Sequence, residues 1–201
     1  MENGIQAFEH QEWVSQRRVP HTITIVDADP SWPCTFAQLA SSIRAALPAP
    51  TIIGLHHVGS TAVPQLAAKP VIDIDLLVAD PGNEASYVPA LEAAGYHLLF
   101  RQPPWYEHRL LALYAPVLVN LHVYGPGALG RESRRHRALR DWLRACPGDR
   151  ALYERVKREA SRRAAEKGEG VAAYTEYKGD VIREIMERAT ADAARQEAAG
   201  S

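Results

Sequence analysis

Two aspartates, Asp73 and Asp75, have the clearest chemical potential in this chain, and they stand inside the apolar run Val71–Val78. Because side chains alternate across a strand, the two carboxylates would share one face, with Cα atoms roughly 6.5 Å apart. Two like charges on an apolar strand are costly unless a cation compensates them. The pair therefore predicts a Mg²⁺ site suited to phosphoryl transfer. A solvated polar face on an edge strand is the alternative that the pair alone leaves open.

A glycine, a serine and a threonine precede this strand as Gly59, Ser60 and Thr61. Glycine allows close backbone approach, and the hydroxyl and N–H groups at a helix start suit phosphate oxygens. Residues 61–72 separate Ser60 from Asp73, which is enough chain to turn and return as a neighbouring strand. We therefore expect a phosphate loop that faces the same cleft as the two acids.

A mixed α/β core followed by helices must position these residues. Alternating and apolar runs predict strands over His21–Val26, Ile52–Val58, Val71–Val78, Tyr96–Arg101, Arg109–Tyr114 and Val117–Tyr124. Helical spacing predicts helices over residues 32–47, 84–94, 131–145, 149–167 and 173–195. These elements divide the chain into a tail over residues 1–20, an α/β core over 21–126 and a helical subdomain over 127–201.

The composition is that of a globular protein, with 46% hydrophobic and 23% charged residues. The chain has no run of roughly 20 apolar residues and no signal-peptide pattern at its start. Its two cysteines, Cys34 and Cys146, are far apart and outside any CxxC pattern, which indicates reduced thiols. We therefore expect a cytoplasmic protein that makes no use of a membrane.

Charge is distributed unevenly along the chain. Residues 131–201 contain 17 Lys and Arg against 13 Asp and Glu, whereas the whole chain has a formal charge of −1. The basic segment is either a solvated helical surface or a positive wall that attracts a phosphorylated ligand. The modest total charge fits a small-molecule partner better than nucleic acid.

The spacing of Gly59, Ser60, Asp73 and Asp75 resembles the signature of the nucleotidyltransferase superfamily, which includes DNA polymerase β. That signature is an apolar residue, Gly and then Gly or Ser, followed after about ten residues by Asp-apolar-Asp or Glu. The longer string HHVGSTAVPQLAAKPVIDIDLLV resembles the GrpB family in particular. The resemblance implies a nucleotidyltransferase-like core with a mixed sheet, followed by a C-terminal helical subdomain.

This resemblance also implies a reaction: transfer of a nucleoside monophosphate from an NTP, ATP first of all, to an unidentified small-molecule acceptor. Asp73 and Asp75 would hold one or two Mg²⁺ ions, and Gly59, Ser60 and Thr61 would bind phosphates. Five basic residues at further matching or facing positions are candidates for the same phosphates: Lys69, Arg140, Arg144, Lys157 and Lys178. Ordinary surface ion pairs are their alternative.

The chain departs from the pattern at two positions. Gln65 stands where the family has glycine, and Asn120 stands where many superfamily enzymes have a third carboxylate. Asn120 would be a weaker, neutral metal ligand, so His122, two residues later on the same strand face, becomes the candidate general base. Two other functions stay open: a non-catalytic nucleotide-binding module, and an ATP-dependent ligase that adenylates a carboxylate. Nothing in the sequence indicates the oligomeric state.

Overall fold

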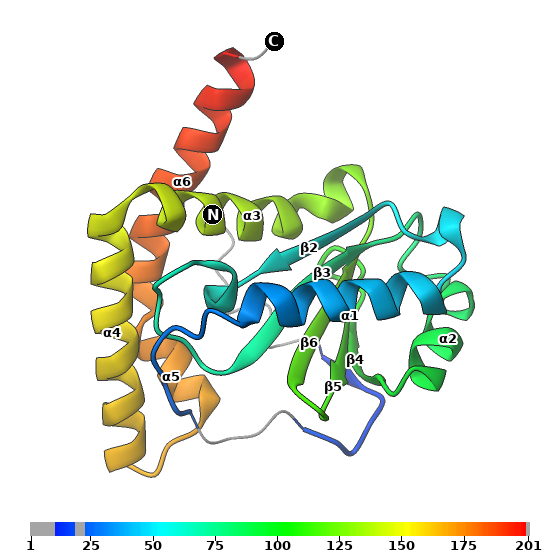
Figure 1. Ribbon diagram of the computed structural model, residues 1–201, viewed down its shortest axis with the longest axis horizontal. Helices are drawn as coiled ribbons and strands as arrows, with labels where there is room; N and C mark the ends of the chain where they lie inside the picture. The colour runs from blue at the N-terminus through cyan, green and yellow to red at the C-terminus, as the bar shows by residue number, and fades with distance from the viewer. Residues whose placement is uncertain (1–10, 19–22, 200–201) are drawn as a thin grey trace. The chain divides into compact units, whose positions relative to one another are not determined.

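The computed structural model describes residues 11–18 and 23–199, and it contains a six-stranded mixed sheet with helices (Figure 1). The strand order is β1-β4-β5-β6-β3-β2. The strands are β1 (Glu12–Trp13), β2 (Gly54–Val58), β3 (Val71–Leu77), β4 (His97–Gln102), β5 (His108–Leu113) and β6 (Leu118–Tyr124). The predicted mixed α/β fold with a helical C-terminal part is confirmed.

The sheet is mixed because it contains both antiparallel and parallel neighbours. Strands β3 and β6 run parallel, whereas β6 with β5, β5 with β4, and β4 with β1 are antiparallel. A parallel neighbour requires a long crossover, and the segment from β3 to β6 includes two further strands and helix α2. The carboxyl ends of β3 and β6 therefore meet at one edge of the sheet.

Along the described chain, helices lie between the strands and after the last of them. They are α1 (Trp32–Ala46), α2 (Val88–Ala93), α3 (Arg131–Ala145), α4 (Pro147–Glu166), α5 (Val171–Tyr177) and α6 (Gly179–Ala199). Short 3-10 turns occupy Ala49–Thr51, Ser60–Ala62, Glu84–Ser86 and Gly127–Gly130. The helix predicted over residues 84–94 is thus a 3-10 turn followed by α2, and the one predicted over 173–195 is two helices.

The strand predicted over His21–Val26 is wrong for the residues that the structure describes. Residues 23–25 have no strand pairing, and Val26 makes an isolated bridge to Ala68. The alternating β-branched pattern has no neighbouring strand to pair with there, and Ile23 and Ile25 pack instead against Ala160, Ala164 and Tyr174. Conversely, β1 falls within the predicted tail, of which residues 1–10 and 19–20 lie outside the described part.

The chain separates into two compact units. The described residues of Met1–Val19, Ser31–His57 and Val71–Ser133 form the first, which we call the sheet unit. Those of Pro20–Pro30, Val58–Pro70 and Arg134–Ser201 form the second, the helical unit. The predicted division at residues 21, 126 and 127 stays a prediction.

The sheet unit has its core on the apolar face of β3. Ile72, Ile74 and Leu76 are all fully buried, and Figure 1 shows α1 running across one face of the sheet. On the edge of this core, Glu84 accepts hydrogen bonds from Arg101 (2.6 Å) and Arg109 (2.8 Å). These charged groups tie the turn before α2 to β4 and β5.

The helical unit is built around a separate apolar cluster. Val63 and Leu66, from the segment between β2 and β3, pack with residues of α3, α4 and α6: Leu143, Tyr153 and Ile185. The segment that contains the predicted phosphate loop is therefore part of the hydrophobic core of the C-terminal helices. Within the described residues, no helix is both long and apolar enough to span a bilayer, and neither cysteine forms a disulfide.

Candidate functional site

Strand register brings the predicted acid pair beside two polar residues of β6. Asp73 is the parallel partner of Asn120, and Asp75 is the partner of His122. Paired positions on neighbouring strands direct their side chains to the same face, so these residues form one polar row. Asp75 is completely buried, whereas Asp73, Asn120 and His122 are partly exposed. The alternative that β3 is an edge strand with a solvated polar face is wrong, because β3 lies between β6 and β2.

Asn120 has an oxygen whose hydrogen-bonding capacity is unused within the described residues. Its Nδ2 donates to Asp73 Oδ1 at 2.9 Å, but its Oδ1 is buried and accepts no hydrogen bond there. If the Asn120 amide were rotated by 180°, its Oδ1 would face Asp73 Oδ1, and two acceptors would meet. The hydrogen bond to Asp73 therefore determines the orientation of the Asn120 amide. A buried acceptor without a donor is costly. This orphaned oxygen beside two carboxylates is the kind of atom that a hard cation satisfies.

His122 belongs to a buried chain of hydrogen bonds. Its Nδ1 lies 3.0 Å from His108 Nε2, and His108 Nδ1 lies 2.7 Å from Gln102 Oε1. An amide oxygen can only accept, so His108 carries a proton on Nδ1. With both rings neutral, the Nδ1–H of His122 then donates a hydrogen bond to Nε2 of His108. Stacking of His108 on Tyr124, with ring centroids 4.9 Å apart, holds these planes in place.

The glycine of the predicted phosphate loop has the backbone conformation that requires glycine. Gly59 has φ 70° and precedes the 3-10 turn Ser60–Ala62, and a positive φ strains other residues. Ser60 is partly exposed, and Thr61 is buried. Gln65 also has a positive φ, of 63°, at the position where the family has glycine. The loop belongs to the helical unit and the acids to the sheet unit, so their common cleft stays a prediction.

Lys157 is a buried lysine in the helical unit. Its side chain is 2% exposed, its Nζ donates to the carbonyl oxygen of Ala67, and it lies 4.7 Å from the centre of the Tyr153 ring. Burial, followed by repulsion from Lys178, lowers the pKa of Lys157 to about 7. Glu154 opposes this shift, and Arg158 and Lys69 add to it.

Lys69 and Lys178 approach one aromatic ring. Their Nζ atoms lie 5.5 Å and 4.6 Å from the centre of the Tyr174 ring, and Tyr174 is itself buried. Cation–π contacts of this kind attract the ammonium group to the face of the ring. Three of the predicted phosphate-binding lysines are therefore gathered in one unit, close enough for Lys69 and Lys178 both to perturb Lys157.

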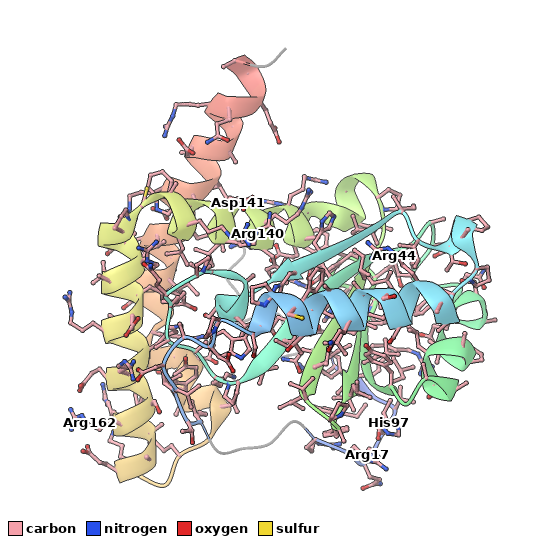
Figure 2. The ribbon with its side chains drawn as sticks, in the orientation of Figure 1. Arg17, Arg44, His97, Arg140, Asp141 and Arg162 are labelled. Carbon is pink, nitrogen blue, oxygen red and sulfur yellow. The ribbon has the colours of Figure 1, made fainter. Side chains whose placement is uncertain are left out.

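Arg140 and Arg144 do not form a matched pair on α3. Arg140 binds both oxygens of Asp141 at 2.8 Å, and Figure 2 shows these two residues on that helix. Arg144 donates from Nε (3.0 Å) and Nη2 (2.7 Å) to the carbonyl oxygen of Ala62. Burial lowers the pKa of Arg144, and Arg140 adds to the effect. Both guanidinium groups thus make intramolecular contacts, and the predicted clamp on a triphosphate stays a prediction.

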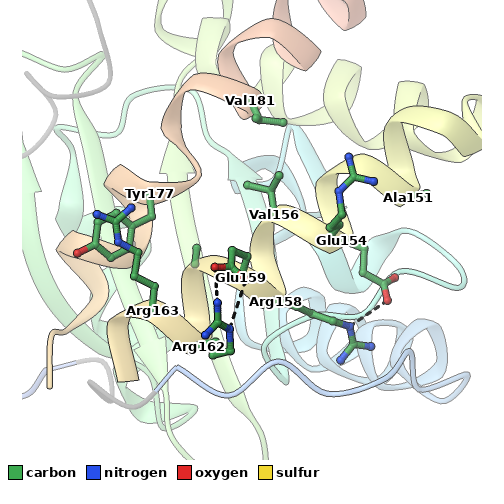
Figure 3. Close-up of a pocket in the computed structure, with 11 residues that line it drawn as sticks. Ala151, Glu154, Val156, Arg158, Glu159, Arg162, Arg163, Tyr177 and Val181 are labelled. Carbon is green, nitrogen blue, oxygen red and sulfur yellow. Dashed lines mark hydrogen bonds and ion pairs between the residues drawn. The ribbon is translucent and has the colours of Figure 1, made fainter. Parts of the chain in front are cut away.

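A groove away from the predicted site residues lies in the helical unit. A groove of about 970 Å³ runs along α4 and is lined by Ala151, Glu154, Arg155, Val156, Arg158, Glu159, Ala160, Arg162, Arg163, Tyr177 and Val181 (Figure 3). None of the predicted site residues lines it. Arg162 pairs with Glu159 and Glu166, and Arg158 pairs with Asp27 and Glu154. Most of its charge is therefore compensated internally, and size alone does not make it the functional site.

Three residues of these networks have no signal in the sequence. Gln102 and His108 flank the turn between β4 and β5, and only the register of β5 with β6 brings His108 to His122. Glu154 contacts the loop through Ala67, 87 residues away. In each case the partner is remote in the chain, so no local pattern could have identified these residues.

Comparisons with known proteins agree with the sequence resemblance. The family model described as GrpB protein matches residues 22–188. A UPF0157 protein of Halalkalibacterium halodurans is 42% identical over 185 residues, which covers 91% of each chain. One from Streptomyces coelicolor is 40% identical over 169 residues and covers 84% of this chain and 85% of that one.

A solved structure and a differently named relative complete the comparison. The crystal structure of the conserved protein GrpB from Enterococcus faecalis superimposes with a TM-score of 0.69 at 25% identity, over 83% of this chain and 96% of that chain. A protein named dephospho-CoA kinase from Mycolicibacterium paratuberculosis is 29% identical over 211 residues. That match includes 92% of this chain but 50% of the kinase.

Proposed function

The chain belongs to the GrpB family, and from that premise we propose that it is a Mg²⁺-dependent nucleotidyltransferase. It would transfer a nucleoside monophosphate from an NTP, first of all ATP, to a small-molecule acceptor. The observation that carries the proposal is the polar row on the sheet: Asp73 and Asp75 beside the orphaned Oδ1 of Asn120. An apolar strand has no structural need for two acids and an unsatisfied amide oxygen at one place.

The oxygen atoms of this row fit magnesium rather than a metal held wholly by the protein. Among the described residues, no group of three or more His, Cys, Asp and Glu side chains could hold a metal ion. Magnesium commonly takes one or two carboxylates and completes its octahedron with water and substrate phosphates. Asp73 and Asp75, supplemented by Asn120, meet that requirement for one or two ions. Magnesium held there would supply neutralising charge for the phosphates of a bound nucleotide.

The remaining residues would bind and orient. Gly59, with its positive φ, would let the backbone approach a phosphate, and the hydroxyls of Ser60 and Thr61 would donate to it. Lys69 and Lys178 would add positive charge from their positions at the Tyr174 ring.

His122 is the proposed base. The Nδ1 of His122 makes the hydrogen bond to His108. Its Nε2 would therefore be the atom that takes the proton from the hydroxyl of the second substrate. The buried Gln102 and His108 would hold that tautomer, in the way that a carboxylate or amide orients a catalytic imidazole.

Nucleotide titration tests the proposal. ATP, GTP, CTP and UTP are titrated with and without Mg²⁺, and pyrophosphate release is followed with a panel of acceptors. Dephospho-CoA belongs in that panel, since relatives named dephospho-CoA kinase match this chain over part of their length. We expect Asp73→Asn to weaken Mg²⁺-dependent nucleotide binding at least tenfold. Glu187→Gln, the same acid-to-amide change on the exposed side of α6, serves as the matched control. The proposal is wrong if the unmodified protein binds no nucleotide at about 1 mM with Mg²⁺.

Asn120 favours a second function, a nucleotide-binding module without turnover. An amide in the third position is a weaker ligand than a carboxylate and cannot accept a proton as a base. Binding that Asp73→Asn abolishes, without pyrophosphate release on any acceptor, would favour this module. Release of AMP that depends on an added amine would instead indicate the ligase that adenylates a carboxylate.

A further inference from the structure

The segment between β2 and β3 is held by charged side chains from α3 and α4. Arg144 donates two hydrogen bonds to the carbonyl oxygen of Ala62, at 3.0 and 2.7 Å. Glu154 Oε2 accepts the N–H of Ala67 at 3.1 Å, and Lys157 donates to the carbonyl oxygen of the same residue. Three ionisable side chains thus bind backbone groups of two residues in one loop.

The backbone hydrogen bonds within this loop are long. The 3-10 turn Ser60–Ala62 closes with bonds of 3.3 and 3.1 Å, and the N–H of Leu66 donates to the carbonyl oxygen of Val63 at 3.3 Å, near the long end for N–H···O bonds. Val63 and Leu66 are buried. Further along, two backbone hydrogen bonds join Ala68 to Val26, at 2.9 and 3.0 Å. Contacts from outside the loop therefore add to its own long hydrogen bonds.

We propose that Arg144, Glu154 and Lys157 are positioning residues that set the conformation of the segment 59–67, which begins with the predicted phosphate loop, rather than ligands of the nucleotide. The role of the loop itself rests on the proposed function. Glu154 carries the wrong charge for a phosphate ligand, Arg144 directs Nε and Nη2 to one carbonyl and Nη1 to Asp141, and Lys157 is almost inaccessible. A charged group bound to a backbone carbonyl or N–H makes a strong hydrogen bond. These contacts therefore constrain the loop in the protein without ligand.

Hydrogen exchange of the loop, measured by mass spectrometry without nucleotide, tests the proposal directly. We expect Arg144→Met and Glu154→Ala to speed exchange in the peptide that covers residues 59–68 by about tenfold. Glu154→Gln should leave exchange slow, because its amide oxygen can still accept the Ala67 N–H. Arg162→Met is the matched control, since Arg162 is exposed on α4 and pairs with Glu159 and Glu166 of the same helix.

A second measurement separates positioning from direct binding. If the residues are ligands, the variants weaken nucleotide binding while loop exchange in the free protein stays unchanged, and the proposal is overturned. Unchanged exchange in both Arg144→Met and Glu154→Ala overturns it as well. Should a variant unfold, the pair Glu154→Gln and Glu154→Ala gives the same comparison with a smaller perturbation. If exchange is faster in these variants but the unmodified protein binds no nucleotide, the positioning role is retained and the proposed function is rejected.

Discussion

Lys157 should make the stability of this protein depend on pH above neutrality. Its pKa is lowered from 10.5 to about 7 in the folded state, first by burial and then by Lys178. Between these two values the unfolded chain binds one more proton than the folded chain. The free energy of unfolding therefore rises with pH in this window, by up to ~1.4 kcal/mol per unit. Below about pH 7 both states are protonated, and Lys157 adds no slope.

Urea unfolding at pH 6.5, 7.5, 8.5 and 9.5 measures this effect against Lys157→Met, which lacks the titrating group. The difference in unfolding free energy between the two proteins should grow by about 2.5 kcal/mol from pH 7.5 to 9.5 in favour of the unmodified protein. Lys178→Met removes a repelling charge, so the rise should begin at higher pH. Lys167→Met, a change on an exposed lysine, should follow the unmodified protein. Equal pH slopes for the unmodified protein and Lys157→Met would refute the reasoning.

Three further substitutions test other parts of the structure. Gly59→Ala should cost about 1–2 kcal/mol in urea unfolding, because alanine is strained at φ 70°; an unchanged midpoint would argue against that conformation. Glu84→Gln should cost about 2 kcal/mol at pH 7, since it removes the charge shared by two arginines. The hydrogen bond to Arg101 lowers the pKa of Glu84, so the cost should shrink as the pH falls and the carboxylate of the parent protein is protonated. Asn120→Asp should tighten Mg²⁺ binding about tenfold in calorimetry, and weaker binding would show that the amide is preferred.

Local patterns were sufficient for the central strand. Alternation in Val71–Val78 predicted that Asp73 and Asp75 share a face, and the observed register agrees. This follows from chain geometry over a few residues, which does not depend on the rest of the fold. Gly59 was predicted to allow close backbone approach, whereas its positive φ was found only in the structure.

The same reasoning was wrong where a pattern needed a partner. The run His21–Val26 alternates like a strand, but a strand exists only through hydrogen bonds to a neighbour, and the described part of this run has one isolated bridge. Edge strand β1 was not predicted, because its two residues gain their assignment only from pairing with β4. Strand propensity describes a fit to a sheet surface rather than a property of the segment alone.

The amino-acid order by itself determined the mixed α/β fold and the shared face of the two acids. Only the tertiary structure decided that His108 bonds to His122 and that Lys157 is buried. It also decided that Arg144, Glu154 and Lys157 bind the backbone of the loop. The physical reason is the distance along the chain between the interacting residues. Backbone conformation and side-chain alternation are set by adjacent residues, whereas burial, hydrogen-bond partners and pKa depend on atoms that the fold brings from dozens of residues away.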